Sequence, residues 1–185
     1  MAAEIFDQVD ENDKVIGVTH KIEAHKNGLI HRVAAVFIFD GDGNLLVQVH
    51  EEGGGILDNT VGGHVRSGES YNDGAAREMQ EEVVLDIPLK TIGTFYSDET
   101  YTGSQFRHMY TLYTGLAPKD WVFEQTEEVK KLLRLPLNNV LNMMTAKPRD
   151  FTAGFLSCMQ FYCKESGFKF PLNLNQYKKE RLSGA

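Results

Sequence analysis

The chain has 185 residues, of which 42% are hydrophobic and 24% are charged, and its formal net charge is -7. This length favours one domain with a single core, spanning residues 1–185, and is short for two domains. The acidic balance argues against a broad phosphate-neutralising surface, so we expect no nucleic-acid polymer as a partner.

The N-terminal part is expected to hold a hairpin and a short helix. Residues 4–18 contain two β-rich runs around an acidic turn, which is the pattern of a small hairpin. A short helix at 21–26 should end at Asn27-Gly28. The first residues are acidic and lack an apolar leader, and no later run approaches the length of a membrane span. We therefore expect a soluble, cytoplasmic protein that binds no membrane.

Two apolar runs then predict the centre of a sheet. HRVAAVFIF (31–39) and LLVQVH (45–50) flank the turn sequence DGDGN, which is a strong hairpin signal. The run VAAVFIF does not alternate between apolar and polar residues. It is therefore expected to be a central strand that is buried on both faces.

The rest of the chain mixes helices and strands. Ser70 is suited to cap a helix, with Asp73 three residues on, so a helix is expected from Tyr71 to about Val84, before Pro88. Further strands are expected at 91–96 and 106–114, and further helices at 137–144 and about 152–165. The pattern predicts a layered α/β fold, in which helices pack on a mixed sheet.

The two cysteines, Cys158 and Cys163, fall in the last of these helices. Residues five apart on a helix point in different directions, so the two thiols are poorly placed to form a disulfide. We therefore expect both to be reduced, which favours a reducing compartment.

The helix at 71–84 is unusually acidic on one side. Glu78, Glu81 and Glu82 fall within an arc of about 100°, next to an apolar face. Three carboxylates this close repel one another unless a cation is present, and hard oxygen ligands suit Mg²⁺ or Mn²⁺. Arg77, four residues before Glu81, could hold that carboxylate in position. The alternative is a solvated surface helix with salt bridges.

The wider spacing favours the metal site. Gly63 is followed by five residues and then by Glu69, and seven further residues lead to Arg77-Glu78. An apolar residue and one more residue separate this pair from Glu81-Glu82. This stretch, residues 63–85, resembles the signature of the Nudix hydrolases. The resemblance implies a loop–helix–loop unit on an α/β/α sandwich. It also implies that the metal is held by Glu78, Glu81, Glu82 and the carbonyl of Gly63.

One position departs from that pattern. The family usually has a glycine two residues after the glutamate pair, where this chain has Val84. Glycine would end the helix in a left-handed conformation, which a β-branched residue resists. The helix is therefore expected to end differently, by running one or two residues longer.

Residues 4–145 also resemble the branch related to isopentenyl-diphosphate isomerase, through EIFDQVDENDKVIG, the stretch from His25 to Arg32, and LDNTVGGHV. In those isomerases, histidines and two downstream glutamates hold another metal, and a cysteine precedes the glycine-histidine pair. Here Gly62 takes the cysteine position and FRHMYTLY supplies no glutamate pair, although His25, His31 and His64 resemble the histidine set. Without those groups, proton transfer to carbon lacks its acid and base, so isomerase activity is the less favoured alternative. A third alternative is that the protein is a non-catalytic module that binds a diphosphate.

The function we predict from the sequence is Mg²⁺-dependent or Mn²⁺-dependent hydrolysis of the diphosphate in a nucleoside diphosphate linked to another moiety. The partner is then a small-molecule diphosphate, and a homodimer is possible, as in many members of the superfamily. Glu128, on a loop with Glu127, is slightly favoured over Glu69 as the general base. The candidate catalytic residues are Glu128, Glu69 and Arg77, the candidate phosphate-binding residues are His64, Arg66 and Arg32, and the candidate metal ligands are Gly63, Glu78, Glu81 and Glu82.

Overall fold

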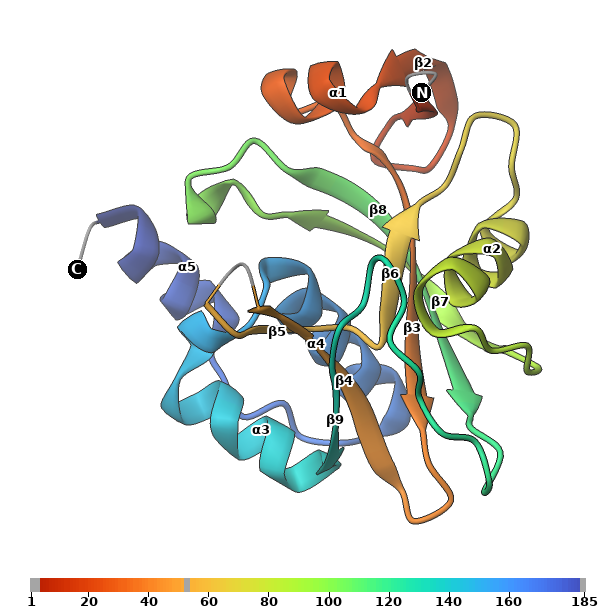
Figure 1. Ribbon diagram of the computed structural model, residues 1–185. Coiled ribbons are helices and arrows are strands. Elements are labelled where there is room, and N and C mark those ends of the chain that lie inside the picture. Colours follow the sequence, from red (N-terminus) through yellow and green to blue (C-terminus); the bar gives the residue numbers. More distant parts are fainter. Residues whose placement is uncertain (1–3, 52–53, 184–185) are drawn as a thin grey trace.

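The strand β3 (His31–Phe39) runs through the centre of a sheet, with helices on both sides (Figure 1). The computed structural model describes residues 4–51 and 54–183, and nine strands lie within these ranges. The other strands are β1 (Ile5–Val9), β2 (Val15–His20), β4 (Asn44–His50), β5 (Ile56–Asp58), β6 (Val61–His64), β7 (Lys90–Asp98), β8 (Arg107–Leu116) and β9 (Leu132–Pro136). The helices are α1 (Lys21–Asn27), α2 (Tyr71–Val83), α3 (Leu137–Ala146), α4 (Ala153–Ser166) and α5 (Leu174–Ser183), with short 3-10 turns η2 (Thr100–Thr102) and η3 (Pro148–Asp150).

The sheet is mixed. β3 pairs in parallel with β8 and antiparallel with β6, while β7 extends the sheet beyond β8. A second antiparallel part consists of β9, β4 and β5. The two parts meet where Phe39 of β3 pairs with Leu45 of β4, beside the predicted DGDGN turn. Beyond this pair, β3 and β4 diverge. The hairpin of β1 and β2 joins the sheet where Gln8 of β1 pairs with His31 of β3.

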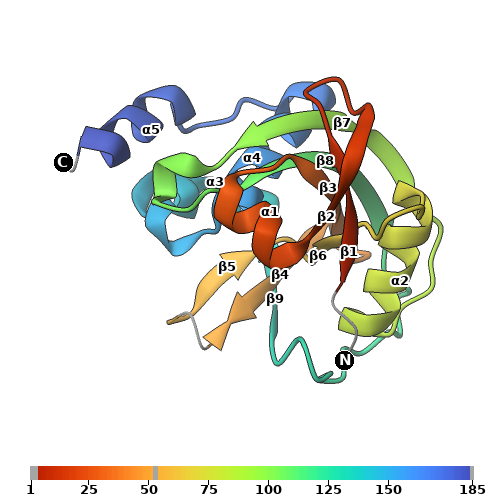
Figure 2. The same cartoon turned by 90° about the horizontal axis from the view of Figure 1, so that it is seen from above.

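Side chains of β3 alternate between two cores. Ala35 and Phe37 belong to the cluster that α3 and α4 cover, whereas Val36 and Ile38 belong to the cluster that α2 covers. This is the period of two that a strand imposes on successive side chains. The central strand is therefore buried on both faces, and the predicted α/β/α sandwich is confirmed (Figures 1 and 2).

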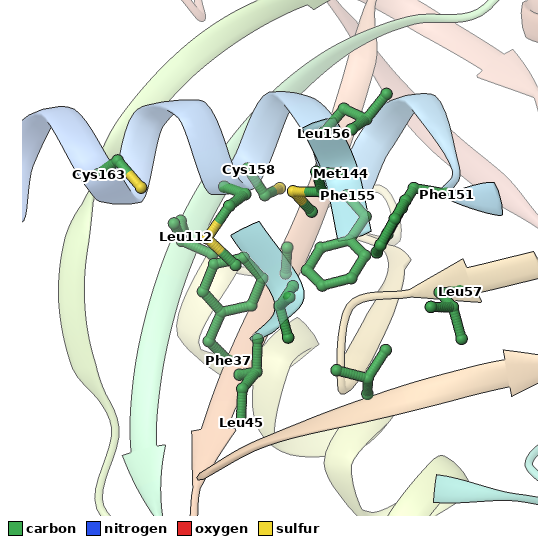
Figure 3. Close-up of a cluster of buried hydrophobic side chains, with 14 of the residues drawn as sticks. Phe37, Leu45, Leu57, Leu112, Met144, Phe151, Phe155, Leu156, Cys158 and Cys163 are labelled. Carbon is green, nitrogen blue, oxygen red and sulfur yellow. The ribbon is translucent and has the colours of Figure 1, made fainter. Parts of the chain in front are cut away.

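The larger core lies between the sheet and α4 (Figure 3). The rings of Phe37 and Phe155 meet edge to face with centroids 5.6 Å apart, a favourable aromatic geometry. Cys158 and Cys163 lie on the same helix, buried and unbridged, as predicted. Burial raises the pKa of the Cys163 thiol to about 11, so this side chain acts as a small apolar group.

The end of α2 differs from the sequence prediction. The helix begins as expected, with the Ser70 side chain accepting a hydrogen bond from the Asp73 backbone N–H, but it does not run past Val83. Val84 instead adopts the left-handed conformation, with φ 51° and ψ 51°, and its N–H donates to the Met79 carbonyl. The expectation of a longer helix was wrong because both neighbours of Val84 are core residues: Val83 is 1% exposed and Leu85 is 5% exposed. Burying both requires the tight turn, and the gain from burying these two apolar side chains exceeds the cost of the left-handed conformation at Val84.

The C-terminal segment, to which the sequence assigned no motif, forms α5 and packs against η2. The Tyr177 ring meets the Tyr101 ring edge to face, with centroids 6.0 Å apart. Lys178 Nζ lies 5.0 Å from the centre of the Tyr101 ring. Across residues 4–51 and 54–183, every helix is too short or too polar to cross a membrane.

Candidate active site

An acidic cluster forms where α2 faces β6 and the loop before β9. Oxygen atoms of Glu78, Glu82 and Glu128 all lie within 4.8 Å of one another, a spacing at which they could share one ion. Glu78 is 8% exposed and Glu82 is 6% exposed, so two of the three carboxylates are buried. The Gly62 backbone N–H donates to Glu82 Oε2 at 3.3 Å.

Burial and mutual repulsion make this cluster unfavourable when ionised. Burial raises the pKa of Glu82 well above its ordinary value, and the nearby Glu78 carboxylate raises it further. Burial also raises the pKa of Glu78, although Arg77 opposes the shift. A divalent cation among the oxygens would favour the ionised forms, so the donor set fits Mg²⁺ or Mn²⁺.

Arg77 connects the helix to the loop before it. Its Nη1 donates to Glu78 Oε1 at 2.7 Å and to Glu81 Oε2 at 3.0 Å, while its Nη2 donates to the His64 carbonyl at 2.9 Å. Its Nε and Nη2 also donate to the two oxygens of Glu69, each at 2.9 Å. Burial alone would lower the pKa of Arg77, but the hydrogen bonds that it donates to Glu69 and Glu78 raise it. Arg77 therefore positions the carboxylates.

Glu69 and Glu81 lie at the edge of the cluster. Both oxygens of Glu69 accept hydrogen bonds, from Arg77 and from the Arg66 backbone N–H. Glu81 has a side chain that is 37% exposed and pairs with Arg77 and, at 3.5 Å, with Arg66. The structure thus assembles Glu78, Glu82 and Glu128, and places Glu81 beside the arginines.

Glu128 reaches the cluster on the loop between β8 and β9. The Thr126 hydroxyl donates to the Glu82 carbonyl at 3.0 Å and accepts from the Val129 N–H at 2.9 Å. Val129 is 1% exposed and anchors the loop in the core. Glu128 itself stays exposed, so its carboxylate can meet both solvent and the buried pair.

Both candidate phosphate-binding arginines are paired with carboxylates. Arg32 Nε lies 2.7 Å from Asp13 Oδ1, and its guanidinium lies over the Tyr71 ring. Arg66 lies 3.7 Å from Glu4 and also faces Glu81. Neither arginine is among the residues that line the cavity described next.

A cavity of about 420 Å³ opens beside Gly62 and Gly63 of strand β6. Its wall includes His64 and the rings of Tyr101 and Phe106. Towards α5 it is lined by Arg149, Tyr177 and Arg181, of which the two arginines also line a neighbouring hollow with η2. No sequence pattern predicted this wall, because it depends on how α5 packs against η2.

A second cluster consists of His25, His31, His64 and His108, with ring nitrogens within 4.8 Å of one another. Burial lowers the pKa of His31 to about 3 and that of His64 to about 2, so both imidazoles are neutral. The sequence pattern pointed to the first three of these histidines but not to His108. His108 lies opposite His31 in the parallel pairing of β3 with β8, and this register cannot be predicted from the sequence. The available signal was a histidine directly before the apolar run MYTLY (109–113).

The sandwich and its acidic loop–helix–loop unit define a protein of the Nudix class. The NUDIX domain model matches residues 29–155, and the chain belongs to the Nudix superfamily, in the branch similar to isopentenyl-diphosphate isomerases. An isopentenyl-diphosphate Delta-isomerase of Serratia proteamaculans is 31% identical over 160 residues, covering 82% of this chain and 87% of the relative. An uncharacterized Nudix hydrolase of Yersinia pestis is 38% identical over 101 residues, covering 52% of this chain and 56% of the relative.

The solved structures agree on the fold. The crystal structure of DR0079 from Deinococcus radiodurans has a TM-score of 0.62 and 22% identity, covering 78% of this chain and 90% of that one. At this identity the similarity establishes the fold, and function must be argued from the site.

Proposed function

We propose that the protein hydrolyses a diphosphate linkage in a nucleoside diphosphate joined to another moiety, with Mg²⁺ or Mn²⁺ bound to the acidic cluster. The observation that carries the proposal is the convergence of Glu78, Glu82 and Glu128 within 4.8 Å. Two of these carboxylates are buried, which costs free energy unless a cation compensates them. Mg²⁺ commonly combines one or two carboxylates with substrate phosphate oxygens.

The residues of the chain have separate roles in this reaction. Glu78 and Glu82 hold the metal, which when bound neutralises charge on the diphosphate oxygens and lowers the pKa of a water molecule. Glu128 is the general base, because it is the exposed member of the cluster and can exchange its proton with solvent. Arg77 holds Glu78 and, through the His64 carbonyl, the end of β6 in position, while Glu69 is occupied with Arg77. By the Nudix pattern, Glu81 is a further ligand of the metal.

The cavity fits the rest of such a substrate. It begins at Gly62 and Gly63 of β6 and is walled by aromatic rings, including Tyr101 and Phe106, which can stack on a flat base. Arg149 and Arg181 place positive charge towards α5, where a second anionic group would lie. His64, which follows Gly63 in β6 and also lines the cavity, is the candidate for contact with a phosphate.

Isomerisation of an allylic diphosphate is the second candidate function, and the similarity to the Serratia isomerase favours it. The site lacks the parts that this reaction needs. Gly62 stands where the isomerase resemblance places a cysteine, and β8 carries His108 where a glutamate pair was implied. Hydrolysis uses water as the nucleophile and needs neither group.

The test is a panel of diphosphate compounds incubated with Mg²⁺, comparing the natural sequence with Glu82→Gln. Release of phosphate or nucleotide by the natural sequence, lost in the variant, supports hydrolysis at this cluster. Equal rates would refute the role of Glu82. Isopentenyl diphosphate is tested in parallel, and its conversion to dimethylallyl diphosphate would favour the isomerase. Binding of a diphosphate without turnover would instead identify a non-catalytic module.

A further inference from the structure

The C-terminal part of the chain is basic, although the chain as a whole is acidic. Residues 147–181 contain seven lysines and arginines but three aspartates and glutamates, whereas the whole chain has a formal net charge of -7. Positive charge gathered in one segment of an acidic protein indicates an anionic ligand. Arg149 and Arg181 bring this charge to the wall of the main cavity.

These two arginines lie where three hollows meet. Arg149 and Arg181 both line the main cavity of about 420 Å³, a hollow of about 390 Å³ beside η3 and a hollow of about 450 Å³ beside η2. Among the described residues, no carboxylate lies within ion-pair distance of Arg181. The Arg181 guanidinium is therefore available to an anion that enters the cavity.

Two tyrosines lie on either side of this position. Tyr177 lines the main cavity and the η3 hollow, and Tyr101 lines the main cavity and the η2 hollow. Tyr101 is 5% exposed, and its hydroxyl is buried without a hydrogen-bond partner in the part of the chain that the structure describes. Burial and the Glu99 carboxylate raise the pKa of Tyr101, whereas the nearby charge of Arg181 lowers it. A buried hydroxyl without a partner is uncommon, and a ligand oxygen next to Arg181 would supply one.

The acidic groups at this end of the cavity are engaged with other side chains. Glu99, which also lines the cavity, accepts a hydrogen bond from the Tyr110 hydroxyl at 2.9 Å. Glu180 accepts one from the Gln176 amide at 2.9 Å and lines the η3 hollow together with Asp150. An anion at this end of the main cavity therefore meets two guanidinium groups and one carboxylate that already has a partner.

The arginines are well separated from the acidic cluster. The cavity extends from Gly63, beside that cluster, to Arg181 on α5, and α5 and α2 lie at opposite sides of the molecule (Figures 1 and 2). An anion bound at Arg181 is thus a different group from a diphosphate at the acidic cluster. Since α5 lies outside residues 29–155, which the NUDIX domain model matches, this end of the cavity is an addition of this chain to the family domain.

We propose that Arg149, Arg181 and the Tyr101 hydroxyl bind a phosphate monoester, so that the substrates are nucleoside diphosphate conjugates that carry one further phosphate group. A phosphate monoester has a charge of about −1.5 to −2 at pH 7 and three acceptor oxygens. Two guanidinium groups and one hydroxyl match that charge and those acceptors, whereas a carboxylate carries a single charge. The substrate class rests on the proposed hydrolysis, but binding of the monoester does not require turnover.

The experiment uses two pairs of compounds, each pair differing by one phosphate monoester: coenzyme A with dephospho-coenzyme A, and NADP⁺ with NAD⁺. Affinities are measured calorimetrically with a chelator present, and kcat/KM is measured with Mg²⁺. The variants of the full chain are Arg181→Ala, Arg149→Ala and Tyr101→Phe. Lys179→Ala, which removes the same charge from an exposed position of α5, is the control. Thermal unfolding of each variant separates loss of binding from loss of folding.

We expect the natural sequence to bind the phosphorylated member of each pair about 10- to 100-fold more tightly. Arg181→Ala and Arg149→Ala should abolish most of this preference, Tyr101→Phe should reduce it by a few-fold, and Lys179→Ala should retain it. No preference in the natural sequence would overturn the proposal, whether or not the variants fold. So would an equal loss of preference in Arg181→Ala and Lys179→Ala.

Turnover separates failure of this inference from failure of the proposed function. Hydrolysis of both members of each pair with equal kcat/KM would support the hydrolase and overturn the phosphate site at α5. Tighter binding of the phosphorylated members, without hydrolysis of any diphosphate compound tested, would support the site and refute the hydrolase.

Discussion

The Glu78 carboxylate occupies the space that a Cβ atom on Gly63 would need, since the two would be only 1.9 Å apart. The glycine is therefore required by contact with a metal-ligand candidate, and its backbone is not in the left-handed region. Gly63→Ala should push Glu78 out of the acidic cluster and lower kcat/KM for a diphosphate substrate by about 100-fold. Mg²⁺ binding, measured calorimetrically, should weaken in parallel.

Gly62→Ala is the matched control for that substitution. A Cβ on Gly62 would meet Asn59 Nδ2 at 3.6 Å, which is an ordinary contact. This variant should keep its Mg²⁺ affinity. If Gly62→Ala and Gly63→Ala behave alike, close packing against Glu78 is not the reason for the glycine.

Arg77 should be important for stability as well as for the site. Its side chain is 15% exposed and donates to Glu69, Glu78 and Glu81, so removing it leaves carboxylates that are partly buried and unpaired. Arg77→Ala should lower the free energy of unfolding by about 3–5 kcal/mol. Arg66→Ala, which removes an arginine that is 45% exposed, should change it by less than about 1 kcal/mol. Urea unfolding with a chelator present would measure both, and equal losses would contradict the buried role of Arg77.

Val84 should carry local strain at the end of α2. A left-handed residue with a side chain costs about 1–2 kcal/mol, so Val84→Gly should stabilise the protein by about 1 kcal/mol. Gly167, the left-handed cap of α4 with φ 75°, has open space around it and allows the reverse test. Gly167→Val should destabilise by a similar amount. Thermal unfolding of both variants is the measurement, and a less stable Val84→Gly protein would show that the valine side chain contributes packing.

The features that the sequence predicted are local ones. The two-sided burial of β3 and the Ser70 cap of α2 follow from periodicity and from residues a few positions apart. The end of α2 was mispredicted because the turn at Val84 is decided by burial of Leu85 in the core. Left-handed propensity is a small effect beside the burial of two apolar side chains.

The parts of the sites that the sequence could not place depend on pairing between distant segments. Glu128 reaches Glu82 because Thr126 and Val129 fix a loop more than forty residues further along the chain. His108 joins the histidine cluster only through the parallel register of β8 on β3. Such registers follow from how whole strands and helices bury their faces, and no local pattern encodes them.

Arg181 should contribute to substrate binding more than to the chemical step. It reaches the cavity from α5, beyond the matched domain, and would contact an anionic group at that end. Arg181→Ala should raise KM with little change in kcat, because this contact is made equally in the ground state and transition state. Lys179→Ala removes the same charge from an exposed position of α5 and is the control. Steady-state kinetics of the two variants would test whether Arg181 contacts the substrate. An equal rise of KM in both variants would point to a general charge effect instead.

Glu128 should act in the chemical step. Replacing it with glutamine keeps the size of the side chain but removes its ability to accept a proton, so Glu128→Gln should lower kcat by about 10²- to 10⁴-fold with little change in KM. The neighbouring Glu127 is also exposed but is outside the acidic cluster, so Glu127→Gln should retain normal activity. Steady-state rates with saturating Mg²⁺ distinguish a base from a metal ligand, since added metal would restore a variant that has only lost affinity. A Glu128→Gln enzyme that recovers full kcat at high Mg²⁺ would assign Glu128 to metal binding and leave the base to be found elsewhere.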